Sequence, residues 1–341
     1  MKSLSTLLPA ILCVGATAIA AGNVSRPDVT VDWTRYHNSD EAVALLKELS
    51  TAFPDLTKLT SIGKSYQGKD LWVLELTNRK VKNPEEKPGY YVDGGIHAGE
   101  FTGSEQVLYL AWYLCVNYGK NPEVTRLVDT RTLYLRPKFN PDGSDYALTH
   151  PDGLRSTVRP WDDDEDGLLD EDKAEDLDGD GAITQMRVAS PLGTHKISTE
   201  DPRIMLPRQV GETGGQYYVL VSEGTDNDGD GQFNEDGVGG IDMNRNFPRT
   251  WELPFIQDGA GRYPLSEPET RAALEFLVAH PNITGIVHNH TSGGFMYRLP
   301  STDPPEAHEP GDLELVRIFG ERFTAVTGQP VRDSYTSPRQ H

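Results

Sequence analysis

Tyr90-Tyr91-Val92-Asp93-Gly94-Gly95-Ile96-His97-Ala98-Gly99-Glu100 is the stretch of sequence that decides the fold. Its aromatic and β-branched start predicts a buried strand, and the two glycines predict a turn directly after it. His97 and Glu100 then lie three residues apart, so both side chains can converge on one ion if the chain bends into a helical turn. This pair alone is more often a surface or capping arrangement, and a metal site needs further ligands.

Strands and helices alternate around this stretch. Asn38 and Ser39 precede an amphipathic pattern that predicts a first helix, and further helices are expected over 103–118 and 268–279. Strands are expected over 59–62, 71–76, 90–92, 133–135 and 283–287, the first two joined as a hairpin through residues 66–69. The alternation predicts an α/β domain.

A second histidine pattern supplies possible partners for His97 and Glu100. Ile286, His288 and His290 alternate along the last expected strand, and His290 enters a Thr-Ser-Gly-Gly turn at its end, where ligands of open α/β sheets are often bound. His288 competes with His290 as a ligand, although it also fits a hydrogen-bonded core histidine. Two imidazoles and a carboxylate can hold a catalytic zinc with one open position.

Asp242-Met243-Asn244-Arg245-Asn246 adds an arginine whose planar fork suits a carboxylate. A surface salt bridge is the alternative for Arg245. Together with the possible metal ligands, this stretch predicts a metal hydrolase that acts on a substrate with a free carboxylate.

The chain begins like an exported protein. An apolar stretch follows Lys2, and Ala18-Ile19-Ala20 forms a small-residue cleavage pattern, so residues 1–20 are expected to be a signal peptide. A membrane anchor is the alternative, but the run is short and Pro9 interrupts it. We expect a secreted or periplasmic protein without a membrane partner after cleavage. Cys115 is the only cysteine beyond the signal peptide, which excludes an intramolecular disulfide.

The net charge of -20 is concentrated in two segments. Residues 162–180 contain twelve acids and one lysine, which gives -11, and residues 223–236 contain six acids and no base, which gives -6. The remainder is near neutral, and no basic cluster indicates a nucleic-acid partner.

The acidic segments lie within residues 160–237, which break the strand–helix rhythm and are interpreted as an insertion. Three stretches alternate acids and end in glycine, as calcium loops begin, and their proposed ligands are Asp162, Asp164, Asp166, Asp176, Asp178, Asp180, Asp226, Asp228 and Asp230. A plain solvated acidic loop does not require glycine in phase with the acids, so structural Ca²⁺ is the favoured interpretation. A calcium-dependent adhesion module would explain these repeats but not the histidines and Arg245.

The motifs together resemble the zinc carboxypeptidases of the carboxypeptidase A and T type. The resemblance rests on motifs that occur in the family's order: Tyr36-His37, Ile62 to Lys69, Gly95 to Glu100, Asn140-Pro141-Asp142-Gly143, Asp242 to Phe247, Ser266 to Glu269 and His290-Thr291. It implies a mixed, mostly parallel central sheet flanked by helices, formed by a catalytic domain over residues 27–341 that contains the insertion. It also implies one catalytic Zn²⁺ and peptide or protein substrates with a free C-terminus.

The resemblance assigns roles to individual residues. His97, Glu100 and His290 would be the zinc ligands, and Asp242 would orient His97. Asn244 and Arg245 would bind the terminal carboxylate of the substrate. Arg155 matches the arginine that stabilises the oxyanion, with Arg159 as the alternative.

The resemblance also implies a general-base glutamate, preceded by a tyrosine that closes over the substrate, well after the third metal ligand. The chain ends at His341 before such residues. We therefore expect a carboxypeptidase whose C-terminal part is missing. The alternatives are a catalytically incomplete paralogue that binds zinc and carboxylates, and a related zinc amidase or deacylase acting on cell-wall peptides.

Overall fold

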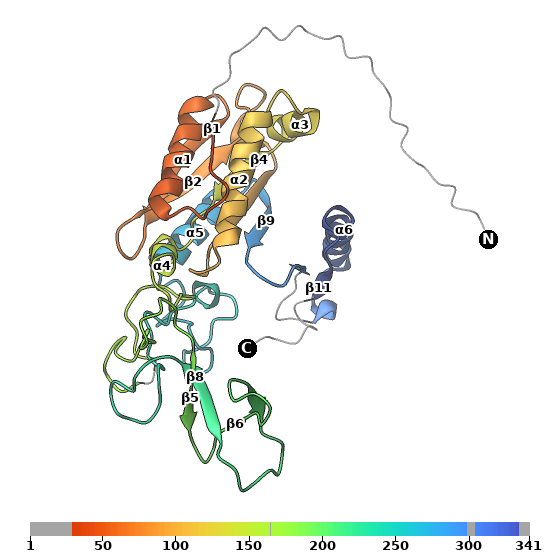
Figure 1. Cartoon of the computed structure of the whole chain (residues 1–341). Helices are drawn as coiled ribbons and strands as arrows, with labels where there is room; N and C mark the ends of the chain where they lie inside the picture. Colours follow the sequence, from red (N-terminus) through yellow and green to blue (C-terminus); the bar gives the residue numbers. More distant parts are fainter. Residues whose placement is uncertain (1–28, 164, 299–303, 334–341) are drawn as a thin grey trace, which may run out of the picture.

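The computed structural model describes residues 29–163, 165–298 and 304–333. Its centre is a five-stranded mixed sheet in the order β1-β2-β4-β3-β9 (Figure 1). The strands are β1 (Thr57–Lys64), β2 (Asp70–Leu76), β3 (Gly89–Gly94), β4 (Thr132–Arg136) and β9 (Ile283–Asn289). β4, β3 and β9 are parallel, whereas β2 is antiparallel to both β1 and β4. Only β2 therefore runs against the common direction, which confirms a mixed, mostly parallel sheet.

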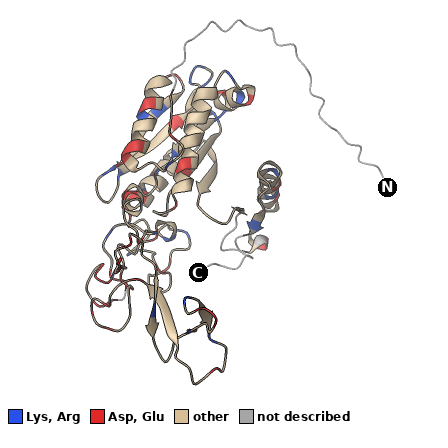
Figure 2. Cartoon of the chain, in the orientation of Figure 1, with Lys and Arg blue, Asp and Glu red and all other residues tan. Residues whose placement is uncertain are grey.

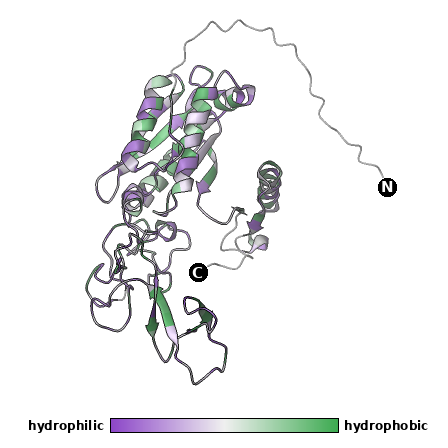
Figure 3. Ribbon diagram, viewed as in Figure 1, coloured by the Kyte–Doolittle hydropathy of each residue, from purple (hydrophilic) through white to green (hydrophobic). Residues whose placement is uncertain are grey.

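Helices cover both faces of this sheet. α1 (Ser39–Ala52), α2 (Phe101–Asn117) and α3 (Pro122–Thr130) share one hydrophobic core with alternate strand residues such as Leu74, Leu133 and Leu135. The intervening residues, including Tyr91 and Tyr134, point to the opposite face and pack against α5 (Pro268–Ala279). Hydrophobic stretches follow the strands and one side of these helices (Figure 3), as a sheet buried on both faces requires.

Every helix and strand expected from the sequence is present. α1 begins with a capping box, because the Asn38 side chain accepts from the backbone N–H of Glu41 and the Glu41 carboxylate accepts from the backbone N–H of Asn38. The sequence interpretation missed two short helices, α3 and α4 (Pro141–Ala147). α4 begins in Asn140-Pro141-Asp142-Gly143, which resembles a turn, but Asn140 acts as its N-cap.

The acidic segment between α4 and η2 (Met243–Arg245) is more ordered than its composition suggests. A four-stranded sheet in the order β5-β8-β6-β7 forms within it, from β5 (Gln185–Ala189), β6 (His195–Ile197), β7 (Met205–Pro207) and β8 (Tyr218–Ser222). Acidic residues are concentrated in the loops beside this sheet (Figure 2).

The remaining elements are η1 (Pro84–Glu86), β10 (Met296–Arg298), η3 (Pro305–Ala307), α6 (Pro310–Thr327) and β11 (Val331–Asp333). β10 and β11 pair in parallel, and α6 packs on them. In the described part of the chain, β9 pairs with β3 alone, and Ile286 and Val287 remain 47% and 48% exposed.

The expected signal peptide, residues 1–20, lies outside the described residues. A search of the described helices found none that is both long and apolar enough to cross a bilayer.

Candidate metal centre

The carboxyl ends of β3 and β9 lie side by side and position the two histidines. Gly94 of β3 is in register with Asn289 of β9, one residue before His290. Two glycines let α2 approach both strand ends: a Cβ on Gly94 would come within 2.2 Å of the Gly103 carbonyl oxygen, and a Cβ on Gly103 within 2.5 Å of the Asn289 carbonyl oxygen. Side chains at either position would therefore push the start of α2 away from the sheet.

Three side chains converge at this point, and their donor atoms all lie within 4.8 Å of one another. Nδ1 of His97 is 2.9 Å from Oε1 of Glu100, and Nδ1 of His290 is 2.8 Å from Oε2 of Glu100. The two Nδ1 atoms are 3.3 Å apart. Zinc–nitrogen bonds of about 2.0–2.1 Å in tetrahedral geometry place two ligand atoms about 3.3–3.4 Å apart, so the histidine pair fits a zinc ion.

The electrostatics of the cluster keep its carboxylate ionised. Burial alone would raise the pKa of Glu100, but the contacts with His290 and His97 outweigh it and lower the pKa to about 2. Burial would lower the pKa of His97, yet Asp242 and Glu100 together raise it above its ordinary value. His290 keeps 37% of its side chain exposed, so the cluster is open to solvent on that side.

Asp242 lies next to His97, on the side of the ring away from Glu100 and His290. Its Oδ1 lies 3.2 Å from Nε2 of His97, and the same oxygen accepts the N–H of Asn244 at 2.8 Å. Burial would raise its pKa, but His97 first, and then Arg155 and Arg245, lower the pKa to about 2. Asp242 thus lies beside the ring nitrogen of His97 that faces away from the cluster, which is where a carboxylate orients a metal-binding histidine.

Arg155, rather than Arg159, contacts this group. Nε and Nη2 of Arg155 lie 3.1 Å and 3.0 Å from Oδ2 of Asp242, while 56% of its side chain stays exposed. The backbone around Arg155 is also hydrogen-bonded to the turn between His97 and Glu100, because the N–H groups of Ala98 and Gly99 donate to the carbonyls of Arg155 and Leu154.

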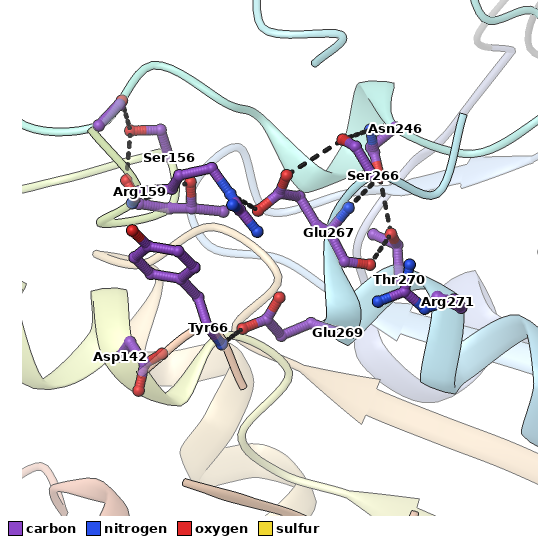
Figure 4. A network of polar contacts seen from close by, with 12 residues as sticks. Tyr66, Asp142, Ser156, Arg159, Asn246, Ser266, Glu267, Glu269, Thr270 and Arg271 are labelled. Carbon is purple, nitrogen blue, oxygen red and sulfur yellow. Dashed lines mark hydrogen bonds and ion pairs between the residues drawn. The ribbon is translucent and has the colours of Figure 1, made fainter. Parts of the chain in front are cut away.

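Arg159 belongs to a separate buried network (Figure 4). Its Nε donates to Oε2 of Glu267 at 2.9 Å, and its guanidinium lies over the ring of Tyr66, 4.2 Å from the centroid. The Glu267 side chain is fully buried. Beside it, Glu269 accepts the N–H of Tyr66 at 2.8 Å. These contacts assign Arg159 to a structural ion pair.

Asn244 and Arg245 lie in η2 and are exposed. Nη1 of Arg245 donates to the carbonyl of Asn244 at 3.2 Å. The charge of Arg245 acts on Asp242, but among the described residues its guanidinium is within salt-bridge distance of no acid and is available to a carboxylate from outside.

His288, the competing ligand, points elsewhere. Its Nδ1 lies 2.8 Å from Oδ1 of the buried Asp93, and burial, which would lower its pKa, is outweighed by this carboxylate, which raises it. The side chain is hydrogen-bonded, but it is not in the core, because 47% of it is exposed.

One contact was not expected from the sequence. The hydroxyls of Thr102 and Thr291 lie 2.8 Å apart and tie the start of α2 to the turn after His290. The only sequence signal was their position, since Thr291 directly follows His290 and Thr102 follows Glu100 by two residues.

Comparison with known proteins identifies the family and the fold of the chain. The family model "Zinc carboxypeptidase" matches residues 42–172 and 215–337, and the gap between the two ranges lies inside the acidic insertion. Human carboxypeptidase D is 38% identical over 113 residues, which are 33% of this chain and 8% of that protein. The zinc carboxypeptidase of Saccharothrix mutabilis subsp. capreolus is 37% identical over 125 residues, 37% of this chain and 29% of that protein.

Solved structures show the shared fold. Thrombin activatable fibrinolysis inhibitor matches with a TM-score of 0.60 and 18% identity over 89% of this chain and 60% of that chain. Carboxypeptidase A from Helicoverpa armigera matches with a TM-score of 0.56 and 17% identity over 90% of this chain and 57% of that chain. The chain thus spans less than two thirds of these relatives. The matched ranges cover most of its sequence, and the chain belongs to the zinc carboxypeptidase family.

Proposed function

We propose that this protein is an exported metallocarboxypeptidase that hydrolyses the C-terminal peptide bond of peptides or proteins. The carrying observation is that Asp242 links the His97–Glu100–His290 cluster to Arg245: its Oδ1 lies 3.2 Å from Nε2 of His97, and the charge of Arg245 lowers its pKa. A metal site next to an available guanidinium suits a substrate whose scissile bond lies one residue from a free carboxylate.

Each residue has a distinct task in this proposal. His97, Glu100 and His290 hold the metal, and Asp242 keeps the ring of His97 in place. Zinc, when bound, polarises a carbonyl and lowers the pKa of water to about 7. Asn244 and Arg245 bind the terminal carboxylate, and Arg155 stabilises the negative charge that develops on the carbonyl oxygen.

A general base must come from a further residue. Glu100 and Asp242 contact the histidines of the cluster and have pKa values of about 2, whereas an efficient base has a pKa near the working pH. Neither carboxylate can therefore accept a proton effectively at neutral pH. We propose that residues 1–341 bind zinc and a C-terminal carboxylate but hydrolyse peptides slowly, which keeps a non-catalytic binding paralogue as the second candidate.

A paired assay tests the proposal. The zinc-loaded chain is given two peptides of identical sequence, one with a free C-terminus and one amidated, and binding and turnover are both measured. We expect at least tenfold tighter binding of the free acid and little hydrolysis. Equal binding of the two peptides would overturn the carboxylate-binding role, and robust turnover would overturn the proposed lack of a base.

Export rests on the N-terminal sequence alone. Mass determination of the mature protein tests it, because cleavage after Ala20 leaves a chain that begins at Ala21. An intact N-terminus would contradict it.

A further inference from the structure

Two acidic loops of the insertion repeat one pattern. The first loop (residues 162–172) and the third loop (residues 226–236) both place aspartate at positions one, three and five, glycine at position six, and Glu-Asp at positions ten and eleven. Asp164, at position three of the first loop, lies outside the described residues. The remaining positions can be compared directly.

The two loops also share a backbone conformation. Gly167 and Gly231 each donate at 3.1 Å to the first aspartate of their loop, Asp162 and Asp226. Both glycines have positive φ values, 97° and 95°. The first and third loops are therefore two copies of one structural unit.

The ends of the two loops cross over. Asp172 and Asp236, the last residues of the loops, form an antiparallel bridge. Oδ1 of Asp172 accepts the N–H of Asn227 at 3.1 Å, and Oδ1 of Asp236 accepts the N–H of Asp163 at 3.3 Å. Residues 163 and 227 occupy equivalent positions, so each loop sends its final aspartate into the other.

These crossing carboxylates are buried without positive partners. Asp236 is 0% exposed and Asp172 1%. Oδ2 of Asp236, Oε2 of Glu171 and both side-chain oxygens of Glu235 are buried and have no hydrogen-bond partner among the described residues. Burying an unpaired carboxylate costs several kcal/mol, so these oxygens indicate ligands that await a cation.

The carboxylates also face one another in two pairs. Asp236 adjoins Glu171, and Glu235 adjoins Asp172. Each pair combines position ten of one loop with position eleven of the other.

We propose that the first and third loops form two calcium sites that exchange one ligand each. Asp162, Asp166 and Glu171 share the first site with Asp236, and Asp226, Asp228, Asp230 and Glu235 share the second site with Asp172. Oxygen-only, carboxylate-rich ligand sets on flexible loops suit calcium, which takes six to eight such ligands, better than magnesium, which keeps much of its water.

The second acidic loop (residues 176–186) shares the first half of this pattern, because Gly181 has a φ of 89° and donates to Asp176 at 2.8 Å. It lacks the Glu-Asp pair at positions ten and eleven, and its aspartates Asp176 and Asp178 gather around Glu223 from β8. The Glu223 carboxylate accepts backbone N–H groups from Leu177, Asp178 and Thr184, and no carboxylate oxygen of this group is buried without a hydrogen-bond partner. The second loop therefore stays outside this proposal.

The two proposed ions would join the chain segments that enter and leave the insertion. Asp162 follows Arg155 by seven residues, and Asp236 precedes Asp242 by six. The chain segments between them are already joined, because Thr157 donates to the carbonyl of Ile241 at 2.9 Å. Calcium at the crossing would hold Arg155 and Asp242 beside the metal centre, where the described residues contain no disulfide to do so.

Terbium, which replaces calcium and emits when excited through a nearby tryptophan, tests the exchange of ligands. Trp161 adjoins the first loop, and its backbone N–H donates to Oδ1 of Asp170 at 3.1 Å. In the full chain loaded with one equivalent of zinc, we expect sensitised emission that calcium displaces and that Trp161→Phe largely removes.

Asp236→Asn is the decisive variant because it changes the third loop but should empty the first site. We expect at least a tenfold higher terbium concentration for half-maximal Trp161 emission, whereas Asp201→Asn, an insertion aspartate paired with Arg203, should match the wild type. Glu171→Gln should reproduce the effect and provides a second variant if Asp236→Asn misfolds, which circular dichroism will show. Unchanged emission with Asp236→Asn would overturn the exchange, and terbium that calcium does not displace would overturn the calcium assignment.

Discussion

Asp242→Asn should weaken zinc binding by about 10- to 100-fold, or about 1.4–2.7 kcal/mol. The carboxylate lies 3.2 Å from Nε2 of His97 and is 8% exposed, so its charge acts on the ring with little screening. An amide has the same shape and can still accept the N–H of Asn244, which preserves η2. The change therefore removes the charge and, with it, the two contacts that Oδ2 of Asp242 makes with Arg155.

The pH dependence separates this effect from a general loss of structure. Zinc must displace the proton of His97, so wild-type affinity falls as the pH decreases through the raised pKa of that histidine. Without Asp242 this pKa decreases, and the midpoint of the pH dependence moves to lower pH. The variant should therefore show its full deficit at about pH 8 and a smaller one at about pH 6.

Competition with a chelating dye at several pH values measures both quantities. Asp40→Asn, an exposed aspartate in the first turn of α1, is the matched control and should bind zinc like the wild type. If Asp242→Asn bound zinc within about twofold of the wild type and with the same pH midpoint, the orienting role of Asp242 would be refuted.

Three further predictions concern other residues. Arg245→Lys should reduce the affinity for a peptide with a free C-terminus by at least about tenfold, measured by calorimetry, because lysine lacks the bidentate fork; equal affinity would exclude Arg245 from the site. Arg159→Leu should lower the free energy of unfolding by about 3 kcal/mol, since it leaves Glu267 buried without a counter-charge; denaturant unfolding that is unchanged would contradict the proposed structural role. The pKa of Glu269 is raised to about 7 by burial and, further, by Glu267 and Asp142, so its contribution to stability is present below about pH 4.5 and lost as the pH rises to 7. Glu269→Gln should flatten this decline in thermal melts across that range, whereas the exposed Glu275→Gln should not.

The sequence predicted those elements whose periodicity is strong. The capped helical pattern from Asn38 and the apolar runs around β3 were sufficient to predict these elements. Strands that are buried on both faces of a sheet consist of nearly continuous apolar residues, which are easily recognised. The sheet β5–β8 was missed, since its short strands pack on few buried side chains and lie in an acidic, glycine-rich context. The composition of the insertion therefore predicted its loops but gave no signal for its strands.

The candidate site was predictable for a different reason. His97, Glu100 and His290 are far apart in sequence, but parallel strands place their carboxyl ends at one edge of the sheet. The choice between Arg155 and Arg159 could not be made from the sequence, because it depends on the buried acid with which each arginine pairs. Arg159 forms its ion pair with Glu267, whereas Arg155 pairs with Asp242. The same limit applies to Glu171 and Glu235, whose partners lie across the loop crossing.

β9 has a consequence for how this chain behaves in solution. Its outer N–H and C=O groups and its exposed Ile286 and Val287 form a ready template for another extended segment. Association through this edge would grow with protein concentration. The strand that leads to His290 is thus also an edge to which a further extended segment, from a second molecule or from elsewhere in the chain, can be added.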